Sequence, residues 1–83
     1  MKIRYAKAAV KTINSMDKPT KHRIKEAVEA LPNGNVKPLR GSKELYRLRV
    51  GGWRIVFSFP QNDTILIEKI APRGDVYKGV LLQ

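Results

Sequence analysis

Three arginines near the middle of the chain have the residue type and spacing expected of a phosphate-binding site. Arg47 and Arg49 alternate with apolar residues, and Arg54 follows them across a pair of glycines. Alternating side chains of a strand point to one face of a sheet. If the two glycines are the whole loop of a hairpin, Arg49 lies directly opposite Arg54, and all three guanidinium groups share one face.

Two arginines placed opposite each other repel in the free protein. A sequence that keeps three of them on one face therefore favours an anionic ligand, because guanidinium groups match the geometry of phosphate. The simpler interpretation is that they keep an exposed sheet face in solution, although lysines or mixed charges would do so without the repulsion. With a three-residue loop after Phe59, Glu68 is expected on the same face, where it can pair with Arg54.

The overall charge points to the same class of partner. The 83 residues include 17 Lys and Arg against 7 Asp and Glu, so the formal net charge is +10. Such a surplus attracts polyanions, and nucleic acid is the polyanion that it favours. We expect four further cations to extend an RNA-binding surface, and the alternative is that they are solvated charges without a specific role. These cations are Lys37, Arg40, Lys43 and Lys78.

Length and composition restrict the class of protein. A chain of 83 residues indicates one domain, spanning residues 1–83. The absence of cysteine excludes disulfides and thiolate zinc sites, and we expect neither a metal nor another cofactor. No apolar run approaches the ~18 residues of a membrane span, and the amino terminus lacks the apolar core of a secretory signal. The expectation is a soluble, cytoplasmic protein.

Hydrophobic periodicity divides the chain into a helical half and a strand half. Apolar residues recur at helical spacing over 6–15. A second helix is expected to begin at 17–19, because proline is favoured in a first helical turn, and to run to about residue 31. Period-two alternation and turn signals predict the strands, the last after a loop of about three or four residues. The expected strands are 2–5, 44–50, 53–59 and 64–70.

These elements predict an α+β fold in which two N-terminal helices pack on a small, twisted, mainly antiparallel sheet. The last strand is apolar on both sides, so we expect it to lie centrally and to be covered in part on both faces. One face of the hairpin is expected to pack under the helices. Its residues are Tyr46, Leu48, Val50, Trp53, Ile55, Phe57 and Phe59.

Two stretches of the chain resemble the RelE/ParE toxin superfamily. LRGSKELYRLRVGGWRIVFSF, residues 39–59, looks like the helix exit and hairpin of that family. ILIEKIAPRGDVYK, residues 65–78, looks like its closing strand and carboxyl-terminal motif. The resemblance implies a RelE-like toxin of a type II toxin–antitoxin system that cuts mRNA in the ribosomal A site. It also implies a cognate antitoxin, expected to be acidic, that holds the toxin inactive in a hetero-oligomer.

The resemblance also implies which residues form the catalytic site. The 2′-hydroxyl of RNA attacks the adjacent phosphate and the 5′-oxygen leaves, without a metal. Members that act as ribonucleases place basic residues on the first hairpin strand, an arginine on the second, and then a late arginine and a tyrosine, and these positions match five residues of this chain. Arg73 would assist the leaving oxygen, and Tyr77 would stack on a base or share a proton. The implied catalytic residues are Arg47, Arg49, Arg54, Arg73 and Tyr77.

The chain departs from its relatives at the base that would remove the 2′-hydroxyl proton. Some relatives have a histidine just before the late arginine, where this chain has Pro72. Arginine is a poor general base, and His22 has polar neighbours typical of a surface residue. Two alternatives therefore accompany the nuclease hypothesis. One is a ParE-like inhibitor of DNA gyrase, and the other is a basic RNA-binding module without catalysis.

Overall fold

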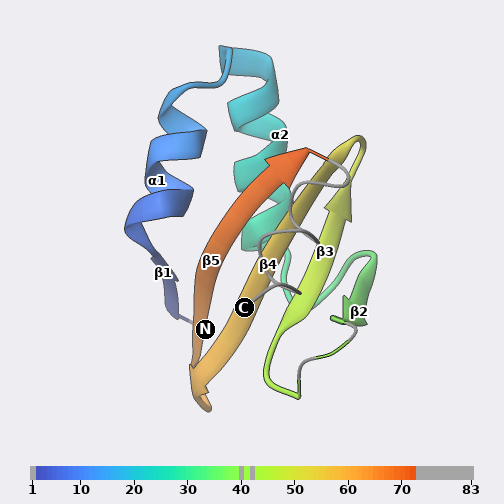
Figure 1. Ribbon diagram of the computed structural model, residues 1–83. Helices are drawn as coiled ribbons and strands as arrows, with labels where there is room; N and C mark the ends of the chain where they lie inside the picture. The colour runs from blue at the N-terminus through green and yellow to red at the C-terminus, as the bar shows by residue number, and fades with distance from the viewer. Residues whose placement is uncertain (1, 40, 42, 73–83) are drawn as a thin grey trace.

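The computed structural model describes residues 2–39, 41 and 43–72, and within them two helices and five strands (Figure 1). The helices pack against one face of a single sheet. This arrangement confirms the α+β fold predicted from the sequence. In chain order the elements are β1 Lys2–Tyr5, α1 Lys7–Asn14, α2 Lys18–Glu29, β2 Val36–Pro38, β3 Tyr46–Val50, β4 Trp53–Gln61 and β5 Thr64–Pro72.

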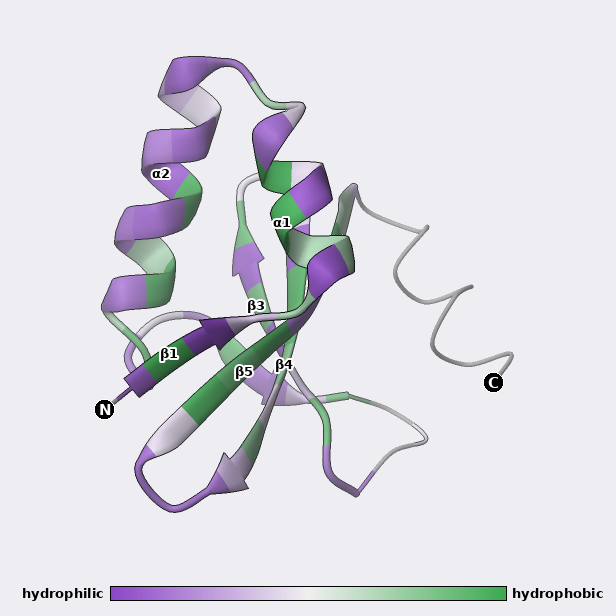
Figure 2. Cartoon of the chain, turned by 90° about the vertical axis from the view of Figure 1, so that its left-hand side faces the viewer, coloured by the Kyte–Doolittle hydropathy of each residue, from purple (hydrophilic) through white to green (hydrophobic). Residues whose placement is uncertain are grey.

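Each helix buries one apolar stripe. In α1 the buried residues are Ala9 and Ile13, four positions apart, and in α2 they are Ile24 and Val28 at the same spacing. Residues four apart lie on one face of a helix, so both stripes can meet the same sheet. In Figure 2 the hydrophobic segments of α2 lie on the side that turns toward α1 and the sheet, whereas its outer side is hydrophilic. Pro19 lies in the first turn of α2, as predicted.

The sheet has the strand order β1-β5-β4-β3-β2. β1 pairs with β5 in parallel, and every other neighbouring pair is antiparallel. The two helices form the crossover between β1 and the later strands. β5 and β4 therefore lie inside the sheet, which explains why β5 is apolar on both sides and confirms its predicted central position.

The β3–β4 hairpin has the predicted register. Gly51 and Gly52 form its whole loop, so Val50 lies opposite Trp53 and Arg49 opposite Arg54. Gly51 has a φ of 58°, in the left-handed region that glycine enters without steric cost. A positive φ at the first loop residue alone is typical of a II′ turn, whose twist matches that of the two strands.

Four details of the sheet differ from the sequence prediction, one of which is that β5 ends at Pro72 and not at residue 70. β4 continues to Gln61, which pairs with Thr64, so the turn into β5 contains only Asn62 and Asp63. The Thr64 hydroxyl donates to the Asp63 carboxylate at 3.0 Å and helps to close this shorter turn. The short edge strand β2 was not expected, because three residues are too few for an alternating pattern to stand out. β3 begins at Tyr46 and not at residue 44.

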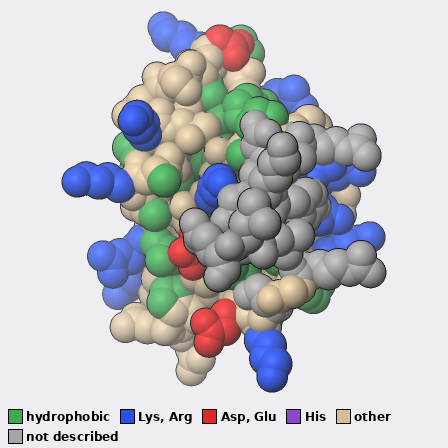
Figure 3. Space-filling model, viewed as in Figure 1, with side chains coloured by type: hydrophobic (Ala, Val, Ile, Leu, Met, Phe, Trp, Pro, Cys, Tyr) green, Lys and Arg blue, Asp and Glu red, His purple; other side chains and the backbone are tan. Residues whose placement is uncertain are grey.

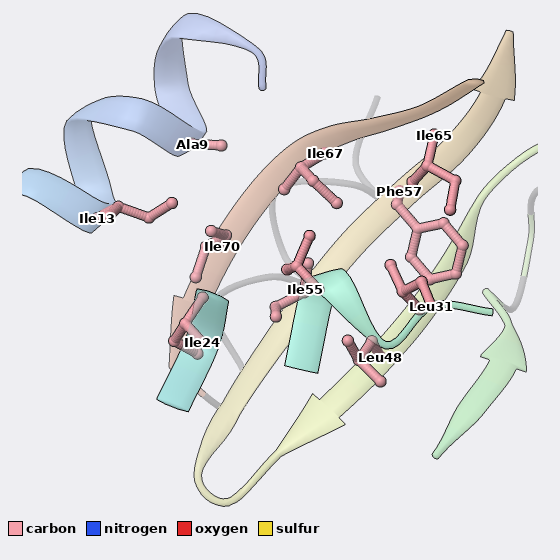
Figure 4. Close-up of a cluster of buried hydrophobic side chains, with 11 residues drawn as sticks. Ala9, Ile13, Ile24, Leu31, Leu48, Ile55, Phe57, Ile65, Ile67 and Ile70 are labelled. Atoms are coloured by element: carbon pink, nitrogen blue, oxygen red, sulfur yellow. The ribbon is translucent and has the colours of Figure 1, made fainter. Parts of the chain in front are cut away.

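The main core fills the space between the helices and the sheet (Figure 4). Ile55 and Phe57 from β4 and Ile67 and Ile70 from β5 project from the sheet toward Ile24 and the other helix residues. The predicted packing of the hairpin under the helices is confirmed for this face, where Trp53 is half-buried against the core. Phe59 is the exception: it is 38% exposed at the far end of β4, although its ring contacts Tyr46 and Phe57 edge-on.

Candidate nucleic-acid interface

Basic side chains from four strands share the face of the sheet opposite the helices. Strand pairing aligns Lys37 of β2 with Arg47 of β3, and Arg47 with Val56 of β4, which in turn lies opposite Lys69 of β5. The next row contains Arg49, Arg54 and Ala71. Because directly paired residues project to the same side of a sheet, these cations form one surface. Figure 3 looks onto this face and shows Lys and Arg side chains around it.

Arg54 lies at the centre of this surface and is buried. Its side chain is only 6% exposed, and its Cα is paired with that of Arg49. One terminal guanidinium nitrogen lies 3.4 Å from the Gly51 carbonyl and 3.3 Å from the Trp53 carbonyl, both long contacts. The Nε atom is buried and has no hydrogen-bond partner among the described residues. A buried cation costs free energy unless it is paired, so the burial of this guanidinium, with only long contacts to two carbonyls, opposes stability.

The other two predicted arginines surround Arg54. Arg47 is half-buried, and its Nη1 atom is also buried without a hydrogen-bond partner within the described part of the chain. Arg49 is exposed. Arg47, Arg49 and Arg54 are called the arginine cluster below. The predicted convergence of these three side chains on one face, away from the helices, is confirmed by the register.

Lys69 belongs to the same surface, although the sequence did not predict it as a site residue. Val56 pairs with Lys69 whereas Phe57 pairs with Ile67, so Glu68 is an extra residue in β5 at a β-bulge. The bulge shifts the alternation by one position and brings Lys69 to the side of the arginine cluster. Simple alternation along β5 gives no signal for such a shift, which is why sequence reasoning could not find this residue.

The expected ion pair between Glu68 and Arg54 is wrong. Glu68 accepts a hydrogen bond from the Ser58 hydroxyl at 2.7 Å and forms no ion pair with Arg54. The shorter turn and the bulge together place Glu68 beside Ser58, whereas Arg54 is paired with Ala71 further along the strands. The arginine cluster is therefore not neutralised by this carboxylate.

The remaining predicted site residues have different outcomes. Lys37 is exposed and lies in the row of Arg47, which extends the basic surface toward the sheet edge. Lys43 is exposed in the connection before β3, where no strand pairing aligns it with the arginine cluster. His22 is exposed and pairs with Glu26 on α2, which confirms it as a surface residue. Four predicted residues lie outside the described part of the chain: Arg40, Arg73, Tyr77 and Lys78.

The chemistry that the described groups offer is electrostatic. Guanidinium groups stay protonated and donate hydrogen bonds in a fixed fork, so they can bind the non-bridging oxygens of a phosphate. Their burial strengthens the interaction, because water screens charges less inside a protein. Among residues 2–39, 41 and 43–72, no three His, Cys, Asp or Glu side chains gather into a possible metal site.

The fold and the basic sheet face define the class of protein, and comparisons with known proteins agree. The family described as "ParE toxin of type II toxin-antitoxin system, parDE" matches residues 3–77. The chain is 31% identical to toxin RelE3 of Methanocaldococcus jannaschii in an alignment that covers 93% of this chain and 96% of that protein. The chain therefore belongs to the RelE/ParE superfamily of toxins of type II toxin–antitoxin systems.

Two solved structures resemble the whole fold. A chain in the RelB–RelE antitoxin–toxin complex from Methanococcus jannaschii has a TM-score of 0.73 and 25% identity, covering 93% of this chain and 98% of that one. A chain in the archaeal RelE–RelB complex from Pyrococcus horikoshii has a TM-score of 0.72 and 30% identity, covering 88% and 94%. No helix in the described part of this chain is long and apolar enough to cross a membrane.

Proposed function

We propose that this toxin is an endoribonuclease that cleaves mRNA in the ribosomal A site and so stops translation. The observation that carries the proposal is Arg54: its guanidinium is buried, faces Arg49 across the hairpin, and has an Nε atom without a partner among the described residues. A phosphate of RNA would supply the missing acceptor. The flanking cations Arg47 and Lys69 would bind the neighbouring charges of the same strand.

The proposed reaction is an in-line displacement at phosphorus. The 2′-oxygen forms a bond to the adjacent phosphorus as its proton leaves, and the bond from phosphorus to the 5′-oxygen breaks. The 5′-oxygen takes up a proton, and the other product ends in a 2′,3′-cyclic phosphate. The arginine cluster would stabilise the extra negative charge on the non-bridging oxygens in the transition state. By resemblance to the family, Arg73 would assist the leaving oxygen, and Tyr77 would stack on a base.

We also propose an acidic antitoxin as the partner, forming a hetero-oligomer with the toxin. Two similar structures are RelB–RelE complexes, and a net charge of +10 favours an acidic protein. An apolar groove of about 180 Å³ lies between β1, α1 and α2 and is lined by Tyr5, Val10, Ile13 and Lys25. Val10 is 42% exposed there, and burial followed by the charge of Glu29 raises the pKa of Tyr5. An apolar side chain from a helix of the antitoxin would fit this groove.

A second candidate function is inhibition of DNA gyrase. The family that matches residues 3–77 is described by its ParE toxins, which favours this alternative. A gyrase inhibitor would use the basic face for protein or DNA contact and would cut no RNA. The two candidates therefore differ in one product, the cleaved message.

The test is translation in a cell-free system followed by primer extension on the message. We expect cuts at codon spacing with the wild-type protein and, for Arg54→Ala, at least about a 100-fold slower cleavage, because a preorganised oxyanion donor is lost. Lys18→Gln removes one exposed charge from the helix side and should leave cleavage unchanged. Intact messages together with a DNA-damage response would favour the gyrase inhibitor. Binding of RNA without either effect would leave only the RNA-binding module.

A further inference from the structure

A groove on the basic face differs in chemistry from its surroundings. Its volume is about 520 Å³, and it lies toward the end of β4 that is remote from the hairpin loop. Its lining is divided about equally between apolar and polar surface: Leu45, Pro60 and Leu66 are apolar, and Ser58 and Glu68 are among the polar groups. Glu44, Tyr46 and Phe59 complete the lining.

The pair formed by Ser58 and Glu68 leaves mainly hydrogen-bond acceptors for a ligand. The Ser58 hydroxyl donates its proton to one carboxylate oxygen of Glu68 at 2.7 Å. The hydroxyl oxygen keeps lone pairs, and an ionised carboxylate can accept about four hydrogen bonds. A ligand that fits here must therefore present hydrogen-bond donors between apolar walls, and a phosphate is excluded by the charge of Glu68.

The groove continues the surface that the proposed function assigns to RNA. Ser58 lies two residues along β4 from Val56, so it projects to the same face about 7 Å further along the strand. Val56 separates Arg47 from Lys69 in the row of cations next to it. A strand of RNA whose phosphate lies on the arginine cluster would thus place a neighbouring base at the mouth of the groove.

We propose that this groove binds one unstacked base of the RNA through its exocyclic amino group, with Glu68 as the acceptor and Ser58 as the group that orients it. The inference rests on the proposed function and adds to it a preference for RNA bases that carry an amino group. Proteins read single-stranded RNA by holding splayed bases between apolar or aromatic groups and bonding to their edges. Cytosine, adenine and guanine carry an exocyclic amino group, whereas the one ring donor on the pairing edge of uracil, N3–H, lies between two carbonyl oxygens that the carboxylate repels.

Cytosine and uracil make a matched pair for the test, because cytosine carries an amino group where uracil carries a carbonyl oxygen. The probes are fluorescent 2′-O-methyl oligocytidine and oligouridine of equal length, which lack the attacking hydroxyl and cannot be cleaved. We expect the wild-type protein to bind oligocytidine about tenfold more tightly, the worth of one hydrogen bond to a charged group. Anisotropy titrations measure both affinities.

Three variants separate the groove from general charge effects. Glu68→Gln should abolish the preference and leave or improve the affinity for oligouridine, because a carboxylate is replaced by an amide that also donates. Ser58→Ala keeps the charge and should reduce the preference. Glu29→Gln removes the same charge from the exposed end of α2 and should keep the preference.

The outcomes of this experiment also distinguish the inference from the proposed function. Equal binding of the two probes by the wild-type protein, or an unchanged preference in Glu68→Gln, would overturn the base-binding groove even if the protein cleaves mRNA. Failure to bind either probe would instead count against the RNA surface as a whole. If Glu68→Gln weakens binding of the antitoxin and leaves the probes unaffected, the groove belongs to the protein partner and the inference is wrong.

Discussion

At the scale of the residue, the position of Arg54 opposes stability and favours binding. A buried guanidinium opposite a second arginine destabilises the folded protein unless an anion is bound. If the protein cleaves RNA as proposed, the same arrangement would spare the site the cost of reorganising its charges when the RNA binds. Side-chain placements that lower the stability of the folded protein in this way concentrate at functional sites.

Replacing Arg54 by an uncharged side chain of similar length should therefore separate stability from activity. In Arg54→Met the free energy of unfolding is expected to rise by about 1 kcal/mol or more, because a buried charge is removed. Cleavage of mRNA is expected to fall at least about 100-fold. Urea unfolding followed by circular dichroism measures the first effect, and primer extension measures the second.

The same substitution at the neighbouring arginine is the control. Arg49 is exposed, so Arg49→Met should change the free energy of unfolding by no more than about 0.5 kcal/mol. A large loss of stability in Arg54→Met would show that the guanidinium mainly supports the hairpin through its carbonyl contacts, and would count against a site poised for phosphate.

At the same scale, the sequence predicted some partners of these arginines and missed others. The opposition of Arg49 and Arg54 was predictable, because a two-glycine loop fixes the register of a hairpin residue by residue. The partner of Glu68 and the position of Lys69 were not, because a bulge depends on how two whole strands pair. The roles assigned to Arg73 and Tyr77 stay predictions.

At the scale of the element, the hairpin loop aligns the whole basic face. Gly51 has a φ of 58° and Gly52 has no positive φ, so only the first glycine is needed for its backbone conformation. The carbonyl of Gly51 also contacts the Arg54 guanidinium at 3.4 Å. A change in this loop would move the register on which Arg49 and Arg54 depend.

Alanine at the two loop positions should have unequal effects. Gly51→Ala is expected to lower the free energy of unfolding by about 1–2 kcal/mol, because a Cβ disfavours the left-handed conformation. The new Cβ would also lie 3.0 Å from a terminal nitrogen of Arg23, a flexible side chain that can move. Gly52→Ala meets no atom within 4 Å and should change the stability by less than about 0.5 kcal/mol.

Urea unfolding of the two alanine variants measures this difference directly. Equal losses would contradict the assignment of the strain to Gly51 alone. A selective loss in Gly52→Ala would mean that the loop adopts a different turn.

The order and type of the elements were predictable because α1, α2 and the hairpin strands have strong periodicity over their whole lengths. The edge strand β2 was missed, since it depends on pairing with β3 and not on its own three residues. The end of β4 was also misplaced: Pro60 and Gln61 look like a turn in sequence but continue the strand past an irregular pairing. Tertiary pairing overrides local preference at both places.

At the scale of the whole molecule, the question is whether net charge or its placement determines RNA binding. The formal charge of +10 would attract RNA to any face of the protein. The sheet face, however, gathers four cations around the buried guanidinium of Arg54, whereas most lysines of the helices are spread over an exposed surface. These four cations are Lys37, Arg47, Arg49 and Lys69. Contacts to phosphate release counterions, so the dependence of affinity on salt counts the contacts that are made.

We expect the logarithm of the binding constant for single-stranded RNA to fall linearly with the logarithm of salt concentration. The expected slope is about −3 if Arg47, Arg49, Arg54 and Lys69 each contribute one charge contact to the phosphates of the RNA. Arg49→Ala should reduce the slope by about 0.7. Lys18→Gln lowers the net charge as well, but it lies on α2 and should leave the slope unchanged. Anisotropy titrations of 2′-O-methyl RNA at several salt concentrations measure all three slopes. Equal reductions in the two variants would mean that the charge of the whole molecule, and not the arrangement on the sheet, holds the RNA.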